Sequence, residues 1–141
     1  MRSLFARSRD LALSLGVGVG VGAIGGGVSY LFLKTLSWSN DTRLDNGWII
    51  YFLPLAGLAI GLAFHYAGES VRGGSNLVLE EIHEPGGGVP RRMAPFVFLS
   101  TAISHLFGAS TGREGAGIQI TASVTDGLSR VFKPSPETRK V

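Results

Sequence analysis

Apolar residues in this chain gather in long uncharged runs that short polar stretches separate. Residues 11–33, 47–68 and 93–112 contain no Asp, Glu, Lys or Arg. As a helix, the first run reaches about 34 Å at ~1.5 Å per residue, which is enough to cross the hydrocarbon core of a bilayer. The pattern therefore predicts spanning helices, with a polar loop at 34–46 between the first two.

Glycine is frequent in the first run, where it alternates with valine in a way that also suits a strand. The uncharged length favours a helix, because an unpaired strand cannot satisfy its backbone groups in lipid. A signal peptide is disfavoured, since its apolar core has only ~7–15 residues. Arginines precede residue 11 and the next loop is neutral, so the positive-inside rule predicts a cytoplasmic N-terminus.

The rest of the chain is more mixed in character. We expect a short amphipathic helix at 77–83 and, at 116–125, an apolar run too short to span. Such a run predicts a half-helix that ends within the membrane, as in ion transporters. The resulting prediction is an all-α, multi-pass membrane protein with a cytoplasmic N-terminus at 1–10, a transmembrane region at 11–132 and a polar tail at 133–141. The tail resembles a connecting loop, so we expect the chain to be a fragment.

Composition supports the membrane class and excludes several others. The chain is 45% hydrophobic and 16% charged, whereas soluble domains have about 25% charged residues. Its net charge of +3 comes from dispersed basic residues, without the dense patch that nucleic acid requires. The absence of cysteine excludes disulfides and thiolate metal sites. We expect no enzyme, no cofactor and no bound metal.

Two weaker motifs leave alternatives open. Residues 20–25 match the dinucleotide pattern G-x-G-x-x-G, which needs a preceding strand and would make the chain a soluble nucleotide-binding protein. Glu80, His83 and Glu84 share one face of a helix, a spacing also found in di-metal bundles. A polar interfacial face explains that trio better. A small structural membrane protein without a transport pathway is a further alternative.

The strongest candidate site is the sequence Gly-Arg-Glu-Gly at 112–115. An ionisable residue at membrane depth suggests a functional site, and the run before Glu114 is long enough to cross while the run after it is not. A helix that starts here has unpaired amide hydrogens, which favour an anion. Glu114 would compete for the same position until it is protonated. His105, inside the third run, is either a proton relay or pore-lining group, or a hydrogen-bonded packing residue.

This motif, together with Gln119, resembles the CLC family of chloride channels and proton-coupled anion antiporters. Segments 76–83, 90–95 and 105–108 are similar to its bacterial voltage-gated-type branch. The resemblance implies a helical fold of two inverted repeats, with only the N-terminal portion present in this chain. It also implies a homodimer in the bacterial inner (plasma) membrane, with chloride or another small anion, and protons in antiporters, as transported ions.

The resemblance also assigns roles to individual residues. Glu114 corresponds to the gating glutamate, and the implied anion-binding residues are Ser75, Asn76, Gly112, Arg113 and Gly115. Ser75 resembles the serine whose hydroxyl donates to the anion. The chain departs from the family at 76–78, where it has Asn-Leu-Val for Gly-Ile-Pro, and at Ala116, which replaces a proline. Fluoride-exporting members show related departures, so fluoride transport stays open, as does a truncated protein that does not transport.

Overall fold

The computed structural model describes the backbone of residues 2–84 and 87–132, and side chains within 15–84 and 87–128. All regular structure in those ranges is helical, and they contain no strand. The elements in chain order are α1 (Arg2–Asp45), η1 (Gly47–Phe52), α2 (Leu53–Tyr66), η2 (Glu69–Val71), α3 (Ser75–His83), α4 (Met93–Leu106) and α5 (Arg113–Phe132). The all-α prediction is confirmed.

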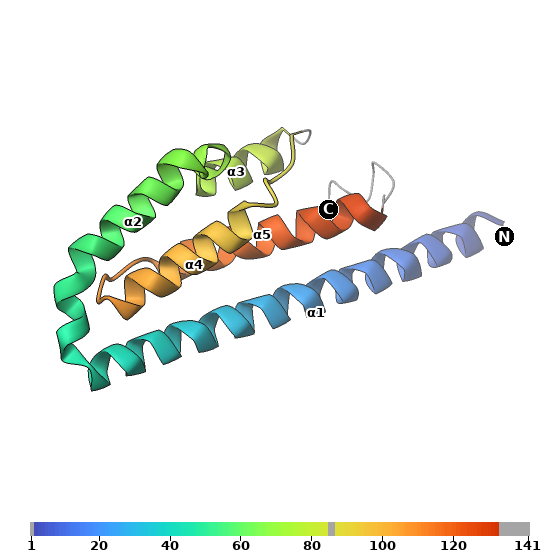
Figure 1. The fold of residues 1–141 in the computed structure, drawn as a ribbon. Helices are drawn as coiled ribbons and strands as arrows, with labels where there is room; N and C mark the ends of the chain where they lie inside the picture. Colours follow the sequence, from blue (N-terminus) through green and yellow to red (C-terminus); the bar gives the residue numbers. More distant parts are fainter. Residues whose placement is uncertain (1, 85–86, 133–141) are drawn as a thin grey trace.

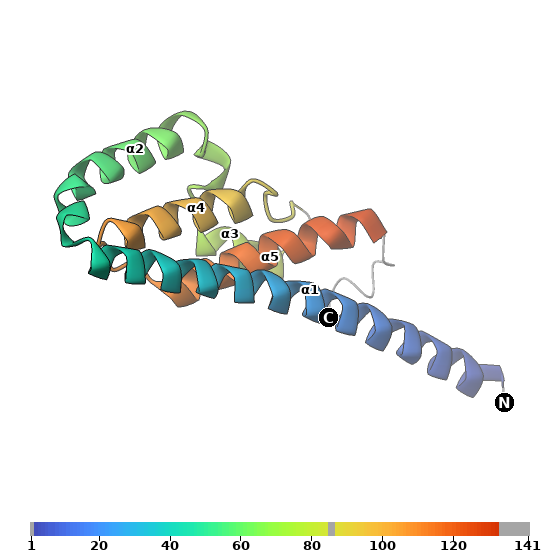
Figure 2. The same ribbon diagram turned by 60° about the horizontal axis from the view of Figure 1, so that its bottom comes forward.

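One long helix, α1, forms a rod against which α4 and α5 pack (Figure 1). The chain reverses direction at η1, and α2 then leads away from the end of the rod. Helices α4 and α5 pack on each other and on the second half of α1, while the first half of α1 extends beyond them (Figure 2). Helix α3 is short and contacts α5.

The first helix is longer than predicted, and the loop expected at 34–46 is wrong. Phe32, Leu36 and Ser39 are all buried and follow the i, i+4, i+7 spacing of one helix face. This buried stripe crosses the predicted boundary, while the charged Lys34 and Asp41 point to the exposed side of the same helix. Polar residues there mark the outer face of a helix rather than its end.

The second apolar run is helical as predicted but is divided at Leu53 into a 3-10 segment and α2. Pro54 falls in the first turn of α2, where it removes no internal hydrogen bond. By length and composition, Leu15–Asp45 and Gly47–Tyr66 are the two candidate membrane spans found among the described residues. Only 11% and 6% of their most apolar windows are buried, so other parts of the chain cover little of them.

The lengths of the last two helices are the reverse of the prediction. Helix α4 has 14 residues and ends at Leu106, because Gly108 adopts a left-handed turn with φ of 92°. Helix α5 has 20 residues and continues past 125, and polar side chains at 123–126 have hydrogen-bond partners there. The carboxylate of Asp126, for example, accepts a hydrogen bond of 2.9 Å from the Val89 amide.

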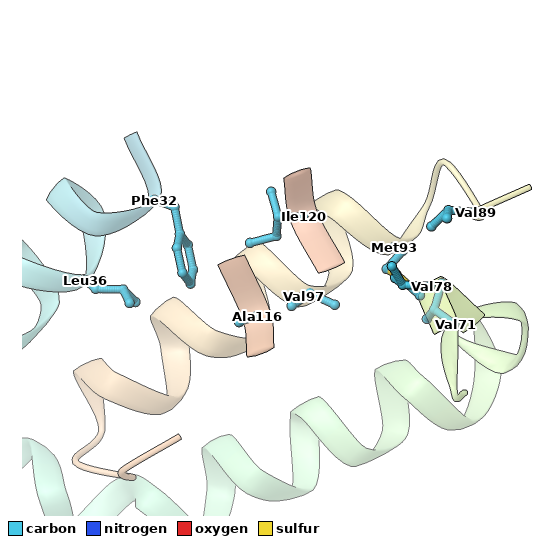
Figure 3. Packing of buried hydrophobic residues seen from close by; sticks show 9 residues of the cluster. All are labelled: Phe32, Leu36, Val71, Val78, Val89, Met93, Val97, Ala116 and Ile120. Carbon is cyan, nitrogen blue, oxygen red and sulfur yellow. The ribbon is translucent and has the colours of Figure 1, made fainter. Parts of the chain in front are cut away.

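The hydrophobic core is small and is formed mainly by α1, α3, α4 and α5 (Figure 3). Its buried members are Phe32, Leu36, Val71, Val78, Val89, Met93, Val97, Ala116 and Ile120. Phe32 also packs against Phe98, with ring centroids 5.5 Å apart. Many large apolar side chains remain exposed, including Leu55, Leu58 and Leu62 along α2. A contiguous apolar surface of this kind marks contact with lipid or with further protein.

Helices α1 and α5 approach each other through small residues. A Cβ atom built on Gly25 would lie 3.1 Å from the methyl carbon of Thr121, and the Ser29 and Thr121 hydroxyls are 3.2 Å apart. Gly25 is also the last residue of the G-x-G-x-x-G match. Because that match lies inside α1 with no strand before it, the dinucleotide interpretation is wrong.

Candidate functional site

The candidate site lies where the N-termini of two helices meet. A turn with Gly74 at φ of 54° precedes α3, a conformation that glycine adopts without a steric penalty. Ser75 is the first residue of α3 and its side chain is exposed. Because the turn directs the chain abruptly into the helix, Ser75 projects toward the start of α5.

Two residues on one face of α5 lie next to the Ser75 side chain. The Gln119 side chain donates a hydrogen bond of 2.8 Å from Nε2 to the Ser75 Oγ. A Cβ atom on Gly115 would lie 3.9 Å from the same oxygen, so the α5 backbone passes next to the hydroxyl. Gly115 and Gln119 are four residues apart, which places them on one side of the helix. Ser75 and Gly115, both predicted to bind an anion, are thus neighbours across 40 positions of sequence.

Glu114 lies on a different face of the first turn of α5, next to an open groove. The groove has a volume of about 640 Å³ and is bordered by α1, α3 and α5. Its lining is mostly apolar and includes Phe32, Leu33, Val78, Ile82 and Ile118, with Arg113 and Glu114 as its charged residues. Glu114 is exposed in this structure, and it stands beside the N-terminal end of the helix, which carries partial positive charge.

His105 fixes the segment that leads into the candidate site. Its side chain is buried, with 7% exposed, and Nδ1 lies 2.9 Å from the Thr101 carbonyl oxygen and 3.2 Å from the Thr111 hydroxyl. Because a carbonyl oxygen can only accept, Nδ1 carries the hydrogen and donates. His105 therefore ties the end of α4 to the residue just before Gly112.

The structure gives less support to the remaining predicted site residues. The Asn76 amide already donates to the Gly73 carbonyl at 3.0 Å, so Asn76 has only its exposed side chain left to offer. A Cβ on Gly112 would meet nothing within 4 Å, which leaves the backbone before α5 open to approach. Glu80, His83 and Glu84 are exposed, and within the part of the chain that the structure describes no group of three metal-type ligands occurs.

Comparison with known proteins decides the family. The sequence model described as "Voltage gated chloride channel" matches residues 56–141, which is more than half of the chain. This chain belongs to the voltage-gated chloride channel (CLC) family. The matched region contains most of α2 and all of α3, α4 and α5, and therefore both helix N-termini of the candidate site.

A curated relative supports the same family. A protein named "Chloride/fluoride channel protein" from Pseudomonas syringae pv. tomato (strain ATCC BAA-871 / DC3000) is 45% identical over 118 residues, or 84% of this chain. The chain spans 26% of the length of that relative. No solved structure gives a significant match. Family membership and the two exposed apolar segments together identify a membrane protein of a channel and transporter family.

Proposed function

We propose that this chain provides part of the pathway by which a CLC protein moves a small anion across a membrane. In this proposal, the anion lies between the Ser75 hydroxyl and the first backbone amides of α5, those of Arg113, Glu114 and Gly115. The observation that carries the proposal is the close approach of Gly115 to Ser75, 3.9 Å from a Cβ position to Oγ. This approach supports a site to which a hydroxyl and backbone amides both donate.

These donors can replace part of the hydration shell of an anion. The first amide hydrogens of a helix have no partners within the helix and lie at the positive end of its dipole. A serine hydroxyl adds a further donor. Within a low-dielectric membrane protein such hydrogen bonds are electrostatically stronger than in water. A small anion that sheds water between α3 and α5 would therefore be stabilised there.

Glu114 acts as the gate in this proposal. Its carboxylate is in the first turn of α5, where the helix dipole attracts negative charge. An anion and an ionised Glu114 would repel each other and compete for the same positive region. Protonation removes the carboxylate charge and leaves the region to the anion, which links anion movement to pH. This scheme suits both a proton-gated channel and a proton-coupled antiporter.

Chloride and fluoride are both candidate substrates. The name of the curated relative contains both ions. The departures at Asn76 and Ala116 lie next to the proposed donors, so they are in position to alter the size and strength of the site. We propose chloride as the principal anion and fluoride as the alternative.

The exposed apolar helices suggest the setting in which the site works. Helix α1 contains one candidate span, and η1 together with α2 forms the other. Arginines precede the first apolar run. We propose a multi-pass protein of the bacterial inner membrane with a cytoplasmic N-terminus, which acts as a homodimer in its full-length form. His105 is proposed to hold the segment before α5, with proton relay as the alternative, because its ring is anchored within α4 at the Thr101 carbonyl and contacts the Thr111 hydroxyl of that segment.

Ion flux from proteoliposomes tests the proposed function. Liposomes loaded with potassium chloride or potassium fluoride and containing the protein should release the anion on addition of a potassium ionophore, faster than protein-free liposomes. Gluconate-loaded liposomes are the control for leakage. If chloride and fluoride leave no faster than in protein-free liposomes, and neither ion raises the thermal stability of the protein, the account of a membrane protein without a transport pathway replaces this one.

A further inference from the structure

Gln119 connects the two helices that meet at the candidate site. It lies in the second turn of α5, half-buried, and its amide nitrogen donates to the Ser75 hydroxyl oxygen at 2.8 Å. Ser75 and Gln119 are 44 positions apart in the chain. No other hydrogen-bond partner of the Ser75 side chain occurs within residues 15–84 and 87–128. The direction of the Ser75 hydroxyl therefore depends on Gln119.

The donor and acceptor chemistry of this pair has a specific consequence. A serine hydroxyl has one hydrogen to donate and two lone pairs that accept, whereas a glutamine amide nitrogen only donates. When Gln119 Nε2 donates to Ser75 Oγ, one lone pair is used and the hydroxyl hydrogen stays available. If the Oε1 atom faced Ser75 instead, the hydroxyl would donate to Gln119 and would have no hydrogen left for an anion.

The glycine turn before α3 lies next to the Gln119 amide. A Cβ atom on Gly74 would lie 3.7 Å from Gln119 Nε2 and 3.9 Å from its Oε1, which is ordinary van der Waals contact. The left-handed φ of 54° rather than lack of space explains glycine at this turn. Gly115, one helical turn before Gln119 on α5, lets the helix approach Ser75 without a side chain between them. The amide is therefore held by its hydrogen bond to Ser75, beside the turn and the close approach of α5.

We propose that Gln119 is a positioning residue for anion recognition, which directs the Ser75 hydroxyl hydrogen toward the anion. The inference rests on the proposed function, because it assumes that Ser75 is an anion ligand. Gln119 does not contact the anion in this account. It occupies an acceptor position of Ser75 and sets the distance between the α3 and α5 N-termini, and its effect on the anion passes through Ser75.

A double-mutant cycle tests this inference in the protein reconstituted into liposomes, with the apparent affinity for chloride measured from flux. Gln119→Ala is expected to weaken chloride affinity about two- to tenfold, the range for one neutral hydrogen bond. Ser75→Ala weakens it as well. In the Ser75→Ala background, Gln119→Ala should then cause no further loss, because its partner hydroxyl is already absent. Thermal unfolding without chloride measures any effect on stability separately.

Two further variants keep the test decisive. Gln119→Glu keeps the shape of the side chain but presents only acceptors, so chloride affinity should fall more than with Gln119→Ala. Asn46→Ala removes an amide hydrogen bond outside the site, from Asn46 Nδ2 to the Thr42 carbonyl at 3.0 Å, and should leave chloride affinity unchanged. An equal loss from Gln119→Ala with and without Ser75 would overturn the inference, while the proposed function would stand if Ser75→Ala still weakens affinity. If Ser75→Ala has no effect, the proposed anion site itself fails.

Discussion

The buried His105 ring and the Thr111 hydroxyl are joined across the turn between α4 and α5, with 3.2 Å from Nδ1 to Oγ1. The same ring nitrogen also donates to the Thr101 carbonyl within α4. Gly108 makes the turn between them possible through its left-handed backbone. The contact sets the path of the chain just before Gly112, so the start of α5 depends on a residue in the preceding helix.

Loss of the Thr111 hydroxyl is therefore expected to destabilise this turn. Thr111→Val removes one hydrogen bond of His105 while keeping the size of the side chain, and should lower the free energy of unfolding by about 1 kcal/mol. Thr111→Ser should restore most of that stability. Thermal unfolding in detergent without added anion is the measurement. Equal stability of the valine variant and the unchanged protein would show that the contact contributes nothing.

The same pair separates the two accounts of His105. If His105 only fixes the turn, Thr111→Val should reduce anion affinity without changing the pH dependence of flux. A proton relay through His105 predicts instead that His105→Gln changes the pH dependence of flux. Flux measured across a pH series for both variants distinguishes these outcomes.

Two neighbouring glycines in α1, Gly25 and Gly26, allow a controlled test of the packing of α1 on α5. A Cβ on Gly25 would be 3.1 Å from the Thr121 methyl, whereas one on Gly26 would meet nothing within 4 Å. Thr121 cannot easily rotate, because its hydroxyl lies 3.2 Å from that of Ser29. Gly25→Ala should therefore be less stable than Gly26→Ala by about 1–3 kcal/mol, the usual cost of overpacking. Equal thermal unfolding midpoints would contradict the close helix contact.

Substitution of Glu114, the proposed gate, should make anion flux independent of pH. In the unchanged protein, anion flux should rise as pH falls, because protonation of Glu114 removes the competing negative charge. Glu114→Gln is neutral at every pH, so its flux should be as high as the acid-stimulated flux and should not vary with pH. Glu80→Gln, an exposed carboxylate on α3, is the control and should keep the pH response. A pH response that persists in Glu114→Gln would remove Glu114 from the gate.

Much of the fold was predictable from the sequence, but the ends of the helices were not. The long runs without charged residues correctly predicted where helices occur, because a segment in lipid must satisfy its own backbone hydrogen bonds. Lys34 and Asp41 wrongly indicate a loop at the end of α1, because Phe32, Leu36 and Ser39 continue the buried stripe of the helix. Charged residues indicate the end of such a helix only when they also occupy the positions of its buried face.

The candidate site was predictable in part and for a different reason. The neighbourhood of Ser75 and Gly115 followed from resemblance to the CLC family and not from spacing, because the two residues come from separate helices. The hydrogen bond from Gln119 was not predicted, since nothing near Gln119 in the sequence indicates Ser75 as its partner. The sequence places Glu114 at membrane depth through a long apolar run followed by a short one, but in the structure the helix before Glu114 is the shorter of the two.

Binding of chloride and fluoride to the Ser75→Ala variant tests the central claim most directly. Isothermal titration in detergent with the unchanged protein, Ser75→Ala and the control Ser70→Ala measures anion affinity without requiring transport. A hydrogen bond to a charged group contributes ~1.5–3 kcal/mol, so the loss of the Ser75 hydroxyl should weaken affinity about tenfold or more. Ser70→Ala should bind like the unchanged protein. Equal anion affinity in all three proteins would contradict the placement of the anion between Ser75 and the start of α5.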